Sequence, residues 1–224
     1  MTISVTEAIR TRRSTRAFLP TPVPEGLLRE ILETARRAPS NSNIQPWLAH
    51  VVTGETLARL KAATAARSTV PPAFDERPYP IYPDPPTEAQ EARRFACGER
   101  QYGSRGIARE DVEGRLRYVY NNHQCFGAPA AMFLFAEPGD GLSQWADLGI
   151  FLQTVMLLLT EAGLGSIGQI SWSVFNRTVK DVLGVPDRLV LYCGLSIGYP
   201  DPADPINAVV ADRAELSEFA TFHD

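Results

Sequence analysis

One long apolar segment constrains the fold of this chain more than any other feature. Leu142 to Ala162 has the spacing of a helix, and that helix is hydrophobic on almost every side. Its most apolar part, Leu148 to Leu159, is flanked by Asp147 and Glu161 and is too short and too polar to cross a bilayer. A helix without a polar face must therefore be buried on all sides, either by the rest of its domain or by a second subunit.

The remaining pattern predicts a fold of the α+β class. Helical spacing, caps and breakers predict further helices at residues 5–11, 24–38, 56–66, 88–102, 109–122 and 173–183. Apolar runs predict strands at residues 48–52, 130–136 and 189–197. The strands are few and the helical stretches between them are uneven, which favours α+β over a regular βαβ series. We expect a single domain over residues 1–224, with a proline-rich excursion at about residues 68–106.

Composition and charge exclude several classes of function. The chain is 44% hydrophobic and 21% charged, as expected for a globular protein with a substantial core. Its net charge of −4 lacks the broad positive field that nucleic acid or an anionic membrane demands, so we expect neither as a partner. The N-terminus has no basic region followed by an apolar stretch, so we expect no signal peptide.

Cysteine and histidine usage argues against metal chemistry. Cys97, Cys125 and Cys193 are odd in number and far apart, and none lies in a C-x-x-C pair. The three histidines are scattered, with no Glu or Cys beside them at ligand spacing. We therefore expect no bound metal, and a reducing cytoplasm is the simplest location for the chain.

Two polar segments together suggest an anion site. Arg12, Arg13 and Arg16 place three guanidiniums within five residues at the end of the first predicted helix. The second segment, Pro39 to Trp47, gathers amide and hydroxyl groups between two prolines. This combination suits a phosphorylated, planar ligand with polar edges. The alternative is that the arginines form only a solvated helix end, where cations are also favoured.

No motif for a nucleophile, a metal or a dinucleotide accompanies this site. The glycine spacing of Gly163 to Gly168 follows a helix rather than a strand, which excludes a Rossmann site. No serine lies in a G-x-S-x-G elbow, and Cys125 has only His123 nearby as a base. A ligand site without catalytic side chains points to chemistry carried by an organic cofactor.

The chain resembles the FMN-dependent nitroreductase family in its polar segments and in its glycine-containing turns. The resemblance rests on six segments in the family's order, namely residues 7–18, residues 38–47, Gly127-Ala128-Pro129, Gly163-Leu164-Gly165, residues 194–200 and a final Asp212-Arg213. It covers nearly the whole chain. The resemblance implies a central, mostly antiparallel sheet surrounded by helices, in an intertwined homodimer with FMN at the subunit interface.

The resemblance also implies roles for individual residues. Arg12 and Arg213 match positions that hold the FMN phosphate, Arg13 and Ser14 match contacts to phosphate and ribityl, and Arg16 matches the basic residue beneath the pyrimidine edge. Pro39, Ser40, Asn41 and Gln45 match a loop that meets the flavin from the other subunit. Asn121 matches an amide at the ring edge, and Gly168, Gln169 and Ile170 match a segment along the flavin whose backbone N–H reaches N5. Ala211 and Gln124 stand where many relatives carry basic residues.

The implied reaction is reduction of a small aromatic substrate by NAD(P)H. The flavin N5 carries the chemistry with no catalytic side chain, in a ping-pong mechanism, with nitroaromatics as the usual acceptors and quinones as a further one. We expect Phe126, Tyr79, Tyr82 and Tyr118 to contact substrate, with plain packing as the alternative for each. Arg93, Arg94, Arg100 and Arg105 either attract a carboxylated aromatic or form a solvated helix face. Other functions left open are a dehydrogenase, a dehalogenase, and a flavin-binding sensor without turnover.

Overall fold

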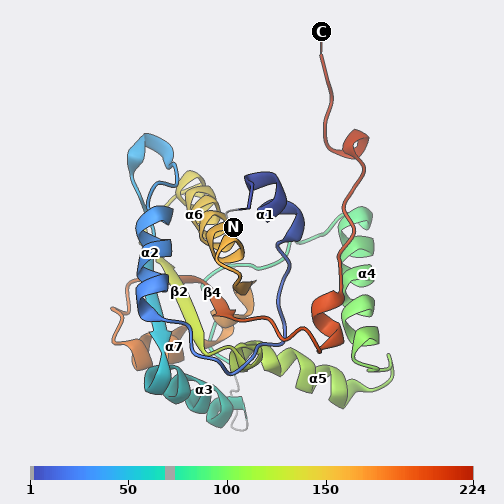
Figure 1. Cartoon of the computed structure of the whole chain (residues 1–224), viewed down its shortest axis with the longest axis horizontal. Helices are drawn as coiled ribbons and strands as arrows, with labels where there is room; N and C mark the ends of the chain where they lie inside the picture. Colours follow the sequence, from blue (N-terminus) through green and yellow to red (C-terminus); the bar gives the residue numbers. More distant parts are fainter. Residues whose placement is uncertain (1–2, 69–73, 224) are drawn as a thin grey trace.

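A four-stranded antiparallel sheet forms the centre of the molecule in the computed structural model (Figure 1). The structure describes residues 3–68 and 74–223. The strands are β1 (Leu48–Thr53), β2 (Ala130–Ala136), β3 (Gly165–Gln169) and β4 (Val190–Gly198), in the order β1-β2-β4-β3. All three pairings are antiparallel, so the α+β class and the antiparallel sheet are confirmed.

The two faces of the sheet carry separate apolar cores because side chains alternate along each strand. On β2, Phe133 and Phe135 enter the core on the side of α3 (Gly54–Ser68) and α7 (Asn176–Leu183). Met132 and Leu134 enter the opposite core, on the side of α2 (Glu25–Ala35) and α6 (Leu142–Glu161). Every residue of β2 is buried, as expected of a strand covered on both faces. The molecule is thus layered as helices, sheet and helices.

The other helices surround this sandwich. α1 (Val5–Thr11) packs on α6, while α4 (Glu88–Ser104) and α5 (Val112–Tyr120) stand to one side of the sheet (Figure 1). Short 3₁₀ turns connect the larger elements: η1 (Asn41–Asn43), η2 (Asn121–Gly127), η3 (Ile170–Phe175), η4 (Pro205–Ala208) and η5 (Leu216–Glu218). The C-terminal segment runs beside α4 and then away from the body (Figure 1).

Helix α6 is the apolar helix that the sequence predicts. It has 20 residues and is, among the described residues, the one helix long and apolar enough to span a membrane by length and composition. Leu148, Phe151, Val155 and Leu159 bury one face of it in the core with α2. Ile150, on another face, is 41% exposed. Within a single chain, α6 is therefore buried on its core face but not on all sides as expected.

Two elements differ from the sequence predictions in the type of structure that forms, and not only by up to three residues at an element's end. Strand β3 was not expected, because its sequence Gly-Ser-Ile-Gly-Gln resembles a turn. Gly165 is required there, since a Cβ at that position would overlap the side chain of Thr15. The predicted helix at residues 173–183 begins as the 3₁₀ turn η3, and α7 starts only at Asn176. Its predicted end at Gly184 is confirmed, with φ of 66°.

The excursion is tied to the body at two points before α4 begins. The Asp75 carboxylate accepts hydrogen bonds from the backbone N–H groups of Arg177 and Thr178 and so caps the first turn of α7. Further along, the Tyr79 hydroxyl donates to the carbonyl of Tyr192. Thr87 then starts α4 with a capping box. Part of the excursion, residues 69–73, lies outside the described residues, and the single-domain assignment stays a prediction.

Candidate functional site

The N-terminal arginines lie where the chain leaves α1 and reaches the edge of the sheet. Arg12 is the C-cap of α1, and its backbone turns from helical to extended conformation. Two residues later Ser14 forms a parallel bridge with Ser166 of β3, and the Thr15 N–H donates to the Ser166 carbonyl at 3.0 Å. The edge strand β3 therefore fixes the arginine segment in place.

The C-terminal segment is held against the same residues by Asn207. Its Oδ1 accepts the Arg16 backbone N–H at 2.8 Å, and its Nδ2 donates to the Ala17 carbonyl at 2.8 Å. Asn207 thereby pairs with the backbone on both sides of the Arg16–Ala17 peptide bond. Asn207 was not predicted as a site residue, because its partners lie about 190 positions away along the chain and nothing local in the sequence signals the contact. This contact brings Arg213 near the N-terminal arginines.

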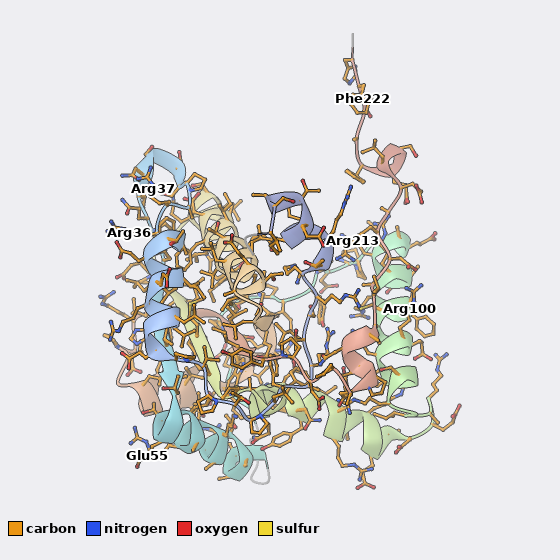
Figure 2. All side chains as sticks on the ribbon, viewed as in Figure 1. Arg36, Arg37, Glu55, Arg100, Arg213 and Phe222 are labelled. Atoms are coloured by element: carbon orange, nitrogen blue, oxygen red, sulfur yellow. The ribbon has the colours of Figure 1, made fainter. Side chains whose placement is uncertain are left out.

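The two chain ends together line one cavity of about 420 Å³, the size of a small-ligand pocket. Arg10, Arg12, Arg13, Arg16 and Arg213 all line it, and no carboxylate does so among the described residues. Burial lowers the pKa of Arg12, and the nearby charge of Arg213 lowers it further. Figure 2 shows Arg213 on the C-terminal segment between α1 and α4. Five guanidiniums thus converge on this pocket, which we call the arginine cavity.

The arginine cavity differs from the other arginine-rich surfaces in its lack of counter-charges. Within residues 3–68 and 74–223, none of its five arginines forms an ion pair. By contrast, the arginines expected either to attract a carboxylate or to be solvated are mostly paired: Arg93 with Glu218, Arg100 with Asp212 and Arg105 with Asp204. Uncompensated guanidiniums in a partly enclosed pocket favour a bound anion, and phosphate matches their donor geometry.

Strand β3 presents a backbone donor beside this cavity. Because the Ser166 carbonyl faces Thr15, Ser166 points its backbone polar groups away from β4. In an antiparallel ladder this direction repeats every second residue, so the Gly168 N–H also faces away from β4. Gly168 and Ile170 are both exposed. The Gly168 N–H is therefore open to a ligand at this edge of β3, and its contact with the flavin stays a prediction.

The side chain of Gln169 is used for internal bonding rather than for a ligand. It is 3% exposed, and its Oε1 accepts a hydrogen bond from the Ser196 hydroxyl. Its Nε2 donates to the Asn122 carbonyl at 2.7 Å. The bond ties the end of β3 to the turn η2, whose first residue, Asn121, is exposed. Gln169 therefore links two segments that were both predicted to meet the flavin.

Tyr118 and Phe126 lie next to the arginine cavity. The Tyr118 hydroxyl donates to the side chain of Gln101, which lines the cavity together with Arg16. Burial raises the pKa of Tyr118, while the nearby charges of Arg16 and Arg105 partly oppose that shift. The ring of Phe126 packs 6.2 Å from that of Tyr118. Both aromatics are buried within the chain, so packing accounts for most of their surface.

The other two predicted substrate residues lie elsewhere. Tyr79 packs against Trp145 at 4.8 Å and donates to Tyr192, and neither partner lines the arginine cavity. Tyr82 lies beneath the guanidinium of Arg94, at 5.1 Å, in a neighbouring groove of about 1020 Å³ along α4. Cys97 and Gln101 line both this groove and the arginine cavity. The structure thus places Tyr118 beside a residue of the arginine cavity, with Phe126 packed on Tyr118, and places Tyr79 and Tyr82 away from the cavity lining. Their contact with substrate stays a prediction.

The predicted loop of Pro39, Ser40, Asn41 and Gln45 is ordered but lies apart from the arginines. Ser42, Asn43 and Gln45 have φ of 51°, 56° and 53°, a left-handed conformation that costs roughly 1 kcal/mol or more for each such residue. Residues 41–45 are exposed. Figure 1 shows α6 between this loop, which follows α2, and α1. One chain alone therefore presents two separate halves of the predicted site.

The buried thiols and His123 give no sign of nucleophilic or metal chemistry. Burial raises the pKa of Cys125 to about 11 and that of Cys193 to about 12, so both thiols are protonated near neutral pH. Burial lowers the pKa of His123 to about 4, against a hydrogen bond to the Ser171 carbonyl. Gln124 donates to the Lys61 carbonyl and the Tyr120 hydroxyl. The described residues contain no group of three or more His, Cys, Asp or Glu that could hold a metal.

Comparison with known proteins identifies the family. Residues 9–199 match the Nitroreductase family. The chain is 36% identical over 214 residues to a 4-nitrobenzoate reductase of Pseudomonas putida, covering 96% of this chain and 93% of the relative. It is 37% identical over 217 residues to Nitroreductase NfnB of Mycolicibacterium smegmatis, covering 96% of this chain and 90% of the relative.

Solved structures agree in fold. The crystal structure of the FMN and NADPH-dependent nitroreductase NfnB from sphigopyxis sp. strain HMH superposes with a TM-score of 0.96 at 43% identity, over 99% of this chain and 100% of that one. The FMN-dependent nitroreductase NfnB from Mycobacterium smegmatis, in complex with NADPH, superposes with a TM-score of 0.92 at 34% identity, over 98% of both chains. With residues 9–199 matched to the family and nearly its full length shared with these proteins, this chain belongs to the nitroreductase family.

Proposed function

We propose that the protein is an FMN-dependent oxidoreductase that reduces nitroaromatic compounds with NAD(P)H. The observation that carries the proposal is the arginine cavity, in which both chain ends converge with five guanidiniums and no carboxylate. A mononucleotide phosphate supplies the missing negative charge, and the cavity volume of about 420 Å³ suits a small cofactor. The relatives named above as nitroreductases, two of them FMN-dependent, support the same assignment.

In this proposal the residues of the chain bind and orient the cofactor. Arg12 and Arg213 hold the phosphate, with Arg13 and Ser14 beside it. Arg16 lies beneath the pyrimidine edge, where a fixed positive charge favours the negative charge that reduction brings to that edge. FMN, when bound, supplies hydride acceptance and donation at N5. The Gly168 N–H, on the exposed edge of β3, is the backbone donor placed toward N5, and Asn121 contacts the ring edge.

The site is completed by a second copy of the chain. The loop from Pro39 to Gln45 lies across α6 from its own arginines, so it meets the flavin of the partner subunit. The apolar surface that α6 leaves exposed, including Ile150, is the face available for this contact. The C-terminal segment also carries exposed Phe219 and Phe222, the latter 84% exposed and projecting from the body (Figure 2). The three free cysteines of the protein are compatible with a cytoplasmic enzyme.

The substrate is a small aromatic that enters beside Tyr118 and Phe126. The relatives are named for nitrobenzoate and nitrobenzene substrates, as is the chloronitrobenzene nitroreductase of Comamonas testosteroni, which is 34% identical over 222 residues. Tyr118 adjoins the cavity through Gln101 and Arg16, and Phe126 packs behind Tyr118. Tyr82 stays a candidate for substrate contact, whereas Tyr79 is bonded to Tyr192 and packed on Trp145 within its own chain.

The test is spectroscopic and kinetic. The purified protein is expected to bind FMN, to lose its absorbance near the flavin maximum when NADH or NADPH is added without oxygen, and to recover it with a nitroarene. Parallel double-reciprocal plots support the ping-pong order. Protein that ignores added FMN removes the proposal. FMN binding without NAD(P)H oxidation supports a sensor, and turnover restricted to halogenated or saturated substrates supports another flavin reaction.

A further inference from the structure

One buried carboxylate connects the core helix to the exposed polar loop. Asp147 lies on α6 and is 5% exposed. Both of its carboxylate oxygens accept the backbone N–H of Asn41, each at 3.1 Å. Within residues 3–68 and 74–223 it forms no ion pair and makes no other side-chain hydrogen bond. Its entire hydrogen-bonding capacity is directed at this one backbone group of the loop.

A carboxylate at this position has a cost that packing alone does not explain. Burying a charge without a cation loses solvation, and an apolar residue of similar size is often neutral or stabilising in its place. The other core-facing residues of α6 are apolar, among them Leu148, Phe151 and Val155. A polar residue that persists in such a row needs a specific role, and here the contact with Asn41 is the one the structure provides.

The loop needs an external support because its own backbone is strained. Ser42, Asn43 and Gln45 all adopt left-handed conformations that residues with a Cβ rarely hold. Two backbone bonds cross the loop, from the Asn43 N–H to the Ser40 carbonyl and from the Ile44 N–H to the Asn41 carbonyl. The bonds that involve its side chains, from the Gln45 N–H to Ser40 Oγ and from Gln45 Nε2 to the Asn43 carbonyl, are exposed and compete with water. The contact with Asp147 is partly buried, because that residue is 5% exposed, so it competes less with solvent than the exposed bonds do.

A second contact from the same face of α6 closes the arrangement. Phe151 lies four residues after Asp147 and therefore on the same side of the helix. Its ring stacks on Trp47 at 4.9 Å, with an angle of 8° between the planes. Asp147 thus holds the start of the loop and Phe151 holds its end. The exposed side chains of Asn41, Ser42 and Gln45 are displayed between these two supports.

We propose that Asp147 is a positioning residue that fixes the loop from Ser40 to Gln45 in the conformation that meets FMN. The role at the cofactor rests on the proposed function, in which this loop contacts the flavin of the partner subunit. Asp147 itself does not touch the cofactor. It acts through the Asn41 backbone, so that the loop is already in its binding conformation before FMN arrives and less conformational freedom is lost on binding.

The test compares Asp147→Leu and Asp147→Asn with Glu161→Leu, which removes an exposed carboxylate from the end of the same helix. In the FMN-free protein, amide hydrogen exchange over residues 41–45 is expected to rise about tenfold in Asp147→Leu, less in Asp147→Asn, and not in Glu161→Leu. The dissociation constant for FMN is expected to rise by about tenfold in the same order. The apoprotein melting temperature of Asp147→Leu is expected to stay close to that of the wild type, since the buried charge is gone.

Each outcome decides one part of the proposal. Exchange over residues 41–45 that is unchanged in both Asp147 variants overturns the positioning role, and if Asp147→Leu does not fold, Asp147→Asn alone decides. Faster exchange with unchanged FMN affinity overturns the link to the cofactor. If the wild type itself binds no FMN, the proposed function fails, while the exchange data on the apoprotein still decide whether Asp147 holds the loop.

Discussion

Replacing Arg12 by alanine tests the arginine cavity most directly. Arg12 is half-buried, and its lowered pKa reports both that burial and repulsion from Arg213. In the bound state a charge-assisted contact to phosphate is worth about 1.5–3 kcal/mol, so its loss corresponds to a rise of roughly 10- to 150-fold in the dissociation constant for FMN. In the FMN-free protein the same substitution removes the repulsion between Arg12 and Arg213 and the cost of burying the guanidinium. It also loses the interaction of a cation with the C-terminal end of α1, which is worth about 0.3–1 kcal/mol. The apoprotein should therefore keep its stability within about 1 kcal/mol while FMN binding falls.

The assay is titration of FMN fluorescence against apoprotein, with unfolding in denaturant measured on the same samples. Arg177→Ala is the matched control, because it removes an exposed arginine at the start of α7 that does not line the cavity. Raising the salt concentration should weaken FMN binding to the wild type more than to Arg12→Ala, since one cation fewer is screened. FMN affinity equal to that of the wild type and of Arg177→Ala at low salt would refute the placement of the phosphate.

Three further predictions address other parts of the molecule. Gly168→Pro removes one N–H from the exposed edge of β3 and should lower the rate of NAD(P)H oxidation at least about tenfold. Gly168→Ala keeps the N–H and places its Cβ 3.6 Å from Leu152, an ordinary contact, so it should retain the rate. Equal stopped-flow rates for the two variants would contradict the role of the Gly168 N–H as a donor. Burial in the folded state lowers the pKa of His123 to about 4, whereas the unfolded chain binds this proton below about pH 6.5. The stability is therefore intact above pH 6.5, and the free energy of unfolding should fall by about 2–3 kcal/mol between pH 6.5 and pH 4.5. Denaturant unfolding of His123→Phe should show a flatter pH dependence over that range, and an unchanged slope would assign the acid sensitivity to other groups. Ile150→Glu places a charge on the exposed face of α6 and should shift sedimentation from dimer to monomer and weaken FMN binding, while an unchanged dimer would move the interface elsewhere.

The elements that follow local rules could be predicted from the sequence. Ser4 caps α1 through the Glu7 N–H as its spacing indicates, Gly184 ends α7, and the continuous apolar run of residues 130–136 forms a central strand. Helix α3 exceeds its predicted range of residues 56–66 by two residues at each end, since caps that lack a strong signal are hard to place. In all these cases the information lies within a few residues of the element itself.

What the sequence did not show depends on contacts between distant segments. Strand β3 exists because glycine allows Thr15 to lie against it, and that neighbour is about 150 residues away in the chain. Asn207 and Asp147 bind backbone N–H groups at separations of 191 and 106 residues, and an isolated Asn or Asp carries no signal for such a partner. Tyr79 shows the opposite problem. Its type suited a substrate pocket, but an aromatic in a proline-rich segment serves equally well as an anchor to the core.

The division of the site between two chains has a thermodynamic consequence. The arginine cavity and the strained loop lie on different sides of α6 within one chain, so in the proposed dimer FMN contacts both chains at once. A ligand that binds each site of the dimer more tightly than the monomer must strengthen dimerisation by that affinity ratio for each site it fills, because the equilibria are linked. Saturating FMN should therefore lower the dimer dissociation constant, and the factor should shrink in Arg12→Ala because the phosphate contact is lost. Sedimentation with and without FMN measures this factor, and a dimer affinity independent of FMN would mean that each chain holds its cofactor alone.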